Sequence, residues 1–179
     1  TTTPVSSVAV IGFDFHGMKP SMAVQLGERV RLGQILFSDK RMPGVHFTAP
    51  GAGVVRAIHR GEQRTLQSVV IELEGADAVQ FPCFSDAQLE DLTPRQVRDN
   101  LQQSGQWVAL RTRPYSKVPA VDAVPASIFV TAMDTHPLAA DPAVVIAEAP
   151  EDFNRGLRVL ARLARVFVCT AMDSEISVA

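Results

Sequence analysis

The chain has 179 residues, of which 46% are hydrophobic, and is long enough for one large or two small domains with buried cores. Its 17 Lys plus Arg and 19 Asp plus Glu give a net charge of −2 without a basic tract, which argues against nucleic-acid binding. No apolar run approaches the roughly 20 residues that cross a bilayer. Cys83 and Cys169 lack partners at metal-ligand spacing, which argues against structural zinc and iron–sulfur ligation. Because the chain starts at Thr1 without Met, we interpret it as a fragment.

Residues 1–75 are predicted to form a compact all-β domain. Short apolar runs bounded by Gly or Pro turns indicate strands at 8–11, 24–26, 30–32, 35–37, 45–47, 54–58 and 66–73. Residues 24–37 and 54–71 resemble each other, each with a strand, a glycine turn and a second strand. We therefore expect two similar halves to fold over one core as a flattened barrel, with residues 49–53 as a tight crossing.

This pattern resembles the biotinyl/lipoyl barrel-sandwich family, in which a hairpin lysine carries the prosthetic group and an A-P-x-x-G-x-V segment follows. Lys40 lies near that lysine, and its modification would make the chain a carrier domain of an acyl-transfer enzyme. Residues 41–44 lengthen the turn before Ala49 and Pro50. The longer turn favours an unmodified Lys40 in a docking or structural module.

Residues 76–105 are predicted to form a helical spacer. Residues 85–88 and 93–96 both fit the S/T-x-x-E/Q capping box, the second with Pro94 at the first helical position. Two short helices follow from these boxes. Gly105 is expected to end the second helix as a left-handed cap.

Residues 105–120 are predicted to form a loop-like segment that leads into the third predicted domain, 106–179. Its cations and aromatic residues suit an anionic or planar ligand, or a partner protein, through hydrogen bonds and stacking. The candidates are Trp107, Arg111, Arg113, Tyr115 and Lys117. The alternative is a solvated connection with aromatic anchors.

The rest of the third domain has the pattern of an α/β fold. Residues 127–131 and 166–170 are predicted strands, and the amphipathic segment 151–164 is a predicted helix between them. A right-handed crossover would make the strands parallel. Ligands bind such sheets beyond the carboxyl ends of the strands, here at 132–137 and 171–173.

Asp134 and His136 are the candidate polar residues at the first of these ends. As an acid/base pair they would make the chain an independent α/β enzyme. As neighbours two residues apart in a loop they fit turn hydrogen bonds better. Neither common glycine-rich phosphate-binding motif occurs in the sequence.

Five longer strings, in this order, closely resemble the family of A subunits of the sodium-translocating NADH:quinone oxidoreductases: GMKPSM from residue 17, GQILFSDKRMPGVHFTAPGAGVV from 33, HRGEQRTLQSVVIE from 59, RTRPYSKVPAVDAVP from 111 and VTAMDTHPLAADP from 130. The resemblance implies a barrel-sandwich domain followed by a Rossmann-like α/β domain with parallel strands. It also implies a part in quinone reduction coupled to sodium export.

The same resemblance implies a peripheral subunit on the cytoplasmic face of the bacterial inner membrane, reaching the membrane only through partner subunits. Ubiquinone would be the substrate of the complex, and flavins and iron–sulfur clusters would belong to other subunits. More distant flavin-binding relatives carry a G-x-G-G-A-G-F-P-T loop, which residues 105–114 lack. We therefore expect this chain to bind no flavin or NADH and not to be catalytic alone.

Overall fold

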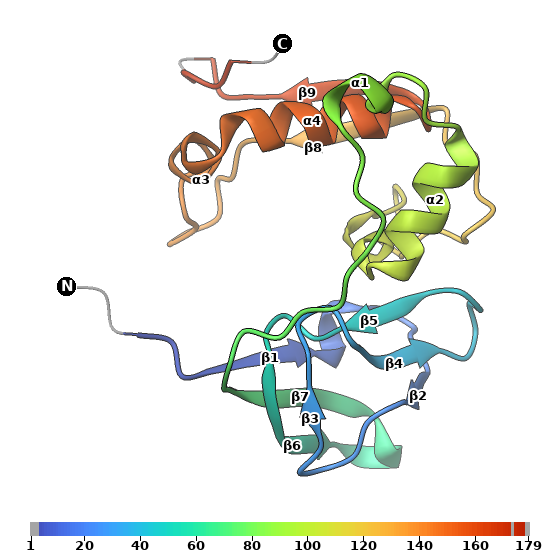
Figure 1. Ribbon diagram of the computed structural model, residues 1–179, viewed down its shortest axis with the longest axis vertical. Helices are drawn as coiled ribbons and strands as arrows, with labels where there is room; N and C mark the ends of the chain where they lie inside the picture. Colours follow the sequence, from blue (N-terminus) through green and yellow to red (C-terminus); the bar gives the residue numbers. More distant parts are fainter. Residues whose placement is uncertain (1–3, 173, 178–179) are drawn as a thin grey trace. The chain divides into compact units, whose positions relative to one another are not determined.

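The computed structural model describes residues 4–172 and 174–177, and its chain divides into two compact units (Figure 1). The barrel unit comprises the described residues up to Pro82 together with Asp99–Ala123. The α/β unit comprises Cys83–Arg98 and the described residues from Val124 onward. The predicted domain bounds of 1–75, 76–105 and 106–179 stay a prediction.

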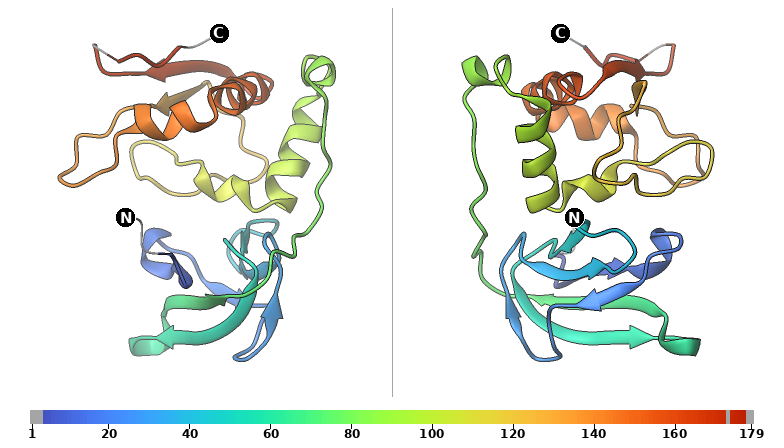
Figure 2. Two further views of the ribbon diagram at one scale, coloured as in Figure 1. Left: turned by 60° about the vertical axis from the view of Figure 1, so that its left-hand side comes forward. Right: turned by 90° about the vertical axis from the view of Figure 1, so that its right-hand side faces the viewer.

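The barrel unit contains two antiparallel sheets that lie face to face (Figure 2). The first has the order β1 (Ser7–Ile11), β7 (Leu66–Leu73), β6 (Gly53–Arg60) and β3 (Arg29–Val30). The second has the order β2 (Pro20–Met22), β4 (Ile35–Asp39) and β5 (His46–Thr48). Short 3-10 turns at Gly12–Asp14 and Glu62–Arg64 join some of these strands.

The core of the barrel unit is built from alternating residues of these strands. Phe37 of β4 is 0% exposed and stacks on Phe47 of β5, with ring centroids 4.6 Å apart. Val55, Val69 and Ile71 of the larger sheet are also fully buried. The predicted β fold of this region is therefore confirmed.

One predicted strand of the barrel, at 24–26, is wrong. The segment is a connection, and the strand that pairs with β4 on the side away from β5 is β2, in the register Pro20 with Asp39. Val24 is nevertheless buried, so its apolar character reflects core packing without strand pairing. The predicted strand at 30–32 is shorter in the structure, where Leu32 makes only an isolated bridge to Ala78.

Two helices follow the barrel strands, α1 (Asp86–Leu89) and α2 (Pro94–Gln103). Both predicted capping boxes are confirmed, because the side chains of Gln88 and Gln96 accept hydrogen bonds from the backbone amides of Ser85 and Thr93, at 2.8 and 3.0 Å. Gly105 has a φ of +75° after the end of α2, as predicted. A 3-10 turn, Gln106–Ala109, follows it.

The α/β unit contains β8 (Ser127–Thr131) and β9 (Arg165–Cys169), which pair in parallel as predicted. Between them lie α3 (Pro142–Glu148) and α4 (Pro150–Ala161). The predicted helix 151–164 corresponds to α4, which ends three residues earlier. The mixed α and β fold class is confirmed.

Helix α4 is joined to α1 and the turn after it by a ladder of three arginines. Arg155 contacts the Asp86 carboxylate at 2.7 Å, Arg158 contacts Glu90 at 2.6 Å, and Arg162 donates to the Leu92 carbonyl at 2.9 Å. The three arginines recur every three or four residues, so they lie along one face of the helix. None of the described helices is long and apolar enough to cross a membrane.

Candidate functional site

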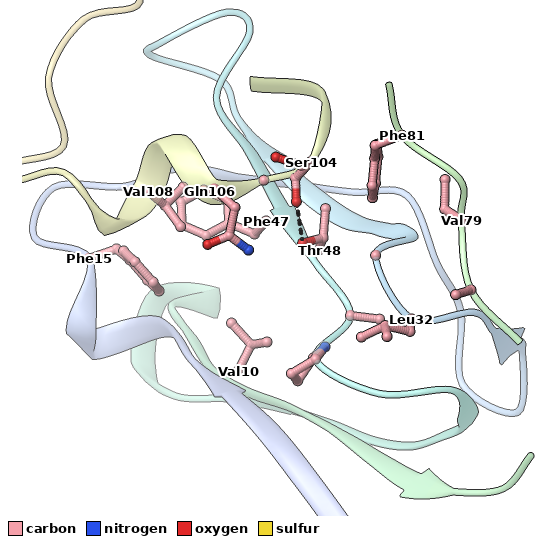
Figure 3. Close-up of a pocket in the computed structure, with 15 residues that line it drawn as sticks. Val10, Phe15, Leu32, Phe47, Thr48, Val79, Phe81, Ser104, Gln106 and Val108 are labelled. Atoms are coloured by element: carbon pink, nitrogen blue, oxygen red, sulfur yellow. Dashed lines mark hydrogen bonds between the residues drawn. The ribbon is translucent and has the colours of Figure 1, made fainter. Parts of the chain in front are cut away.

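A cavity of about 580 Å³ lies within the barrel unit (Figure 3). Its walls come from segments that are far apart in the sequence: β1, the turn after β1, the crossing after β5, residues 78–81, and the chain following α2. The volume is in the range of small-molecule sites in proteins, about 300–1,000 Å³. The cavity is therefore the candidate binding site of this unit.

Aromatic rings form much of the apolar wall. Phe47 is held from behind by its stack on Phe37, and Phe15 meets Phe47 edge-on with ring centroids 4.6 Å apart. Phe81 lines the cavity from the segment that leaves the barrel strands. Rigid rings around an open space suit a flat, largely apolar ligand.

The polar part of the wall comes from the end of α2. Thr48 donates its hydroxyl hydrogen to the Ser104 carbonyl at 3.2 Å, which ties β5 to this segment. A Cβ on Gly105 would lie 2.5 Å from the Thr48 hydroxyl oxygen, so only glycine permits this close approach. The Gln106 amide points toward the open space in Figure 3, where it can donate or accept one hydrogen bond to a ligand.

Arg111 brings a positive charge against Phe15, one of the residues that line the cavity, without lining it itself. Its guanidinium lies 5.0 Å above the centre of the Phe15 ring, and it donates to the carbonyls of Val108 and Leu110. Burial lowers the pKa of the Arg111 guanidinium, and the Asp14 carboxylate acts in the opposite direction. An arginine remains charged under these conditions, so it holds a cation behind an aromatic wall.

The other candidates of the 105–120 segment differ in how far they are buried. Trp107 is buried, and its indole N–H donates to the Pro119 carbonyl at 2.9 Å, so it anchors the segment. Arg113, Tyr115 and Lys117 are exposed on a tight loop, closed by a hydrogen bond of 2.8 Å from the Thr112 amide to the Lys117 carbonyl. The structure thus places Arg111 against the cavity-lining Phe15, Trp107 in the core and the other three candidates in solvent.

Asp134 and His136 belong to the α/β unit, after the carboxyl end of β8. Asp134 Oδ1 lies 2.6 Å from His136 Nδ1 and accepts a hydrogen bond of 2.9 Å from the His136 amide. These bonds, led by that of the amide, lower the pKa of the Asp134 carboxyl. Since the His136 side chain is 87% exposed, the pair is a solvated turn. Asp173, in the second predicted strand end, lies outside the described residues.

Lys40 is exposed after β4, at the turn toward β5. Neighbouring Asp39 is buried, and its carboxylate accepts hydrogen bonds from the backbone amides of Lys19 and Arg41 at 3.1 and 2.9 Å. Asp39 therefore ties the start of this turn to the segment before β2. No group of three or more His, Cys, Asp or Glu among the described residues could hold a metal ion.

Sequence reasoning missed the cavity residues Phe15, Phe47 and Gln106. The only relevant pattern was that Phe13 and Phe15 lie in a short, otherwise polar segment, which indicated aromatic side chains near the surface. Nothing in the sequence indicated that Phe15 contacts Phe47 or that Gln106 lines the same cavity, since both depend on how the segments pack.

Two family models match the chain in order. The model described as the NqrA N-terminal barrel-sandwich hybrid domain matches residues 1–74, and the one described as the NqrA second alpha/beta domain matches residues 92–179. These matches agree with the barrel strands and the parallel sheet of the structure. A barrel-sandwich hybrid domain is thus followed by an α/β domain.

Curated relatives of the chain include proteins named as the A subunit of Na(+)-translocating NADH-quinone reductase. The protein of Pseudomonas aeruginosa (strain UCBPP-PA14) is 66% identical over 94% of this chain and 38% of its own length. Those of Hahella chejuensis and Teredinibacter turnerae are 60% and 56% identical over 93% and 96% of the chain. The chain spans about 38% of the length of these relatives. It belongs to the NqrA family, the A subunits of Na(+)-translocating NADH-quinone reductases.

Proposed function

We propose that the chain is part of a peripheral subunit of a respiratory NADH:quinone oxidoreductase that couples quinone reduction to sodium export. The observation that carries this proposal is the 66% identity to a protein named as the A subunit of such an enzyme. In this role the subunit lies on the cytoplasmic face of the inner membrane and is held there by partner subunits. Flavins and iron–sulfur clusters belong to those partners, and ubiquinone is the substrate of the complex.

The quinone contact of this chain is the cavity of the barrel unit. A quinone headgroup is a flat ring with two carbonyl oxygens that accept hydrogen bonds. Phe15 and Phe47 offer ring surfaces, and the Gln106 amide offers a donor beside them. The Arg111 cation behind Phe15 favours the negative charge that a quinone gains on reduction.

A second contact is assigned to the loop that carries Arg113, Tyr115 and Lys117. All three side chains are exposed, and Tyr115 is 76% exposed. Aromatic and arginine side chains are enriched where proteins meet other proteins. The loop therefore fits a docking contact with a partner subunit.

The docking contact is tested by co-purification. The double variant Arg113→Glu/Lys117→Glu should lower the amount of the partner subunits that is recovered with this protein.

The quinone contact is tested in the complete complex with Gln106→Trp, which places an indole where the cavity opens. Gln103→Trp is the matched control, because Gln103 is exposed on α2 and does not line the cavity. We expect Gln106→Trp to raise the KM for ubiquinone at least fivefold, with unchanged reduction of a water-soluble electron acceptor by NADH. Gln103→Trp should change neither.

Equal kinetics for the two tryptophan variants would overturn the quinone contact while leaving membership of the complex intact. Failure of the unaltered protein to co-purify with the other subunits would overturn the proposed function itself.

A further inference from the structure

Three cations gather where the β4–β5 hairpin meets the segment that precedes β2. Lys19, Lys40 and Arg41 are exposed there, and we call them the hairpin cation cluster. All three belong to the barrel unit. The cavity and the loop that carries Arg113 and Lys117 contain none of them.

The pairing of β2 with β4 places two of these residues opposite each other. β2 and β4 are antiparallel with Pro20 opposite Asp39, and the Lys40 amide donates to the Lys19 carbonyl at 2.8 Å. Lys19 and Lys40 are therefore directly opposite neighbours at the end of the ladder. Like charges in this arrangement repel each other and destabilise the strand pair.

The buried side chain of Asp39 links the two segments that carry the cluster. Asp39 is 3% exposed, and its carboxylate accepts from the amides of Lys19, just before β2, and of Arg41, in the hairpin turn. Arg41 then reaches across with Nη1 to donate to the Gly17 carbonyl at 3.1 Å. The three cations are thus carried on two cross-linked segments whose backbones lie side by side.

The charges of the cluster have no acidic side chain as ion-pair partner among the described residues. By contrast, Arg155 and Arg158 on α4 both contact carboxylates. A fixed group of unpaired cations, which costs stability through repulsion, is complementary to a group of carboxylates on another molecule.

We propose that the hairpin cation cluster docks an Asp- or Glu-rich segment of a partner protein. This inference rests on the proposed function, in which the partner is another subunit of the complex. The remaining donors of Arg41 suit a carboxylate fork, and the two lysines add charge beside it. Anionic lipid surfaces are recognised by clusters of about 4–8 Lys and Arg, which exceeds the three residues here, so a protein segment fits better.

The test uses the full-length protein in the assembled complex and a carbodiimide, which joins a lysine amine to a carboxylate only when the two touch. We expect crosslinks from Lys19 or Lys40 to an Asp- or Glu-containing peptide of a partner subunit, identified by mass spectrometry. Lys19→Arg/Lys40→Arg keeps the charge but cannot form the crosslink, so it should assemble normally without these products.

Charge reversal gives the second measurement. Lys19→Glu/Lys40→Glu should be released from the complex at a several-fold lower NaCl concentration than the unaltered protein. The matched control is Arg60→Glu/Arg64→Glu, which makes the same charge change at the exposed β6–β7 turn and should leave the release concentration unchanged.

Three results would overturn the docking of the hairpin cation cluster on a partner protein. Equal release of all variants, or crosslinks from these lysines to no partner carboxylate, would overturn it even when the unaltered protein enters the complex. Binding of the full-length protein to vesicles of 30% phosphatidylglycerol that is lost only in Lys19→Glu/Lys40→Glu would assign the cluster to lipid and also overturn it. If the unaltered protein does not enter the complex, the proposed function fails first.

Discussion

The barrel unit and the α/β unit are stabilised in different ways. The barrel unit holds most of the fully buried side chains among the described residues, including Phe37, Leu36 and Ile71. The α/β unit has a smaller core and an exposed ladder of arginine contacts, led by Arg155 with Asp86. Burial of apolar area contributes more to stability than exposed ion pairs do. We therefore expect the barrel unit to be the rigid part of the chain and the α/β unit the softer one.

The stacked phenylalanine pairs of the two units also differ in how far they are buried. Phe129 of β8 and Phe167 of β9 stack with centroids 5.2 Å apart, yet Phe129 is 66% exposed. Parallel strands are usually covered on both faces. The equivalent aromatic stack of the barrel unit, Phe37 on Phe47, lies in the core. Two similar ring pairs thus differ in burial, and they provide a direct test of the comparison.

The largest expected effect comes from Phe37→Ala. It removes a fully buried ring and should lower the free energy of unfolding by about 3–5 kcal/mol. Urea unfolding followed by the fluorescence of Trp107, the single tryptophan and a buried residue of the barrel unit, measures this loss. Phe129→Ala is the matched variant and should cost less than about 1.5 kcal/mol, measured by amide hydrogen exchange of β8 and β9. Similar losses for both would contradict the comparison.

The next effect contrasts two glycines, one in each unit. Gly105→Ala forces a side chain into a left-handed conformation and against Thr48, which should cost about 1–3 kcal/mol. Gly156 lies within α4 with no atom near its missing Cβ, so Gly156→Ala should stabilise the helix by about 0.5–1 kcal/mol. Thermal unfolding of both variants measures the difference. An unchanged or raised stability of Gly105→Ala would show that the close approach at Gly105 is not required.

The smallest effect concerns the arginine ladder. Hydrogen bonds from Arg155, then its charge and that of Arg158, lower the pKa of the Asp86 carboxyl in the folded state. A lowered folded pKa contributes stability above the unfolded pKa, about 3.9, which is lost as the pH falls through the folded value. Asp86→Asn should therefore be slightly less stable than the unaltered chain near pH 7, and the difference should vanish in acid or high salt. A difference that does not shrink as the pH falls below the unfolded pKa would contradict this explanation.

Local patterns in the sequence were enough to predict much of the fold. The capping boxes at 85–88 and 93–96, the strand at 127–131 and most barrel strands follow from residue spacing, which is a local property. The strand at Pro20–Met22 escaped prediction because three residues with one proline carry little strand signal. Its pairing with β4 is supported by Asp39, whose carboxylate accepts a hydrogen bond from the Lys19 amide just before β2.

The candidate site was less predictable because it depends on contacts between distant segments. Arg111 was a candidate on composition alone, but its role follows from Phe15, nearly a hundred residues earlier in the chain. Likewise, Arg155 and Asp86 are 69 positions apart, and their pairing left no local pattern. Trp107 was a candidate for ligand or partner contact, with an aromatic anchor as the alternative, and its indole N–H donates to the Pro119 carbonyl.

The most direct test of the proposed quinone contact is photolabelling of the complete complex with a photoreactive ubiquinone analogue, followed by peptide mapping. We expect label on peptides of this protein that contain Phe15, Gln106 or Arg111, reduced by excess ubiquinone and by Gln106→Trp but not by Gln103→Trp. Label confined to the partner subunits, or to peptides of the α/β unit, would contradict the quinone contact.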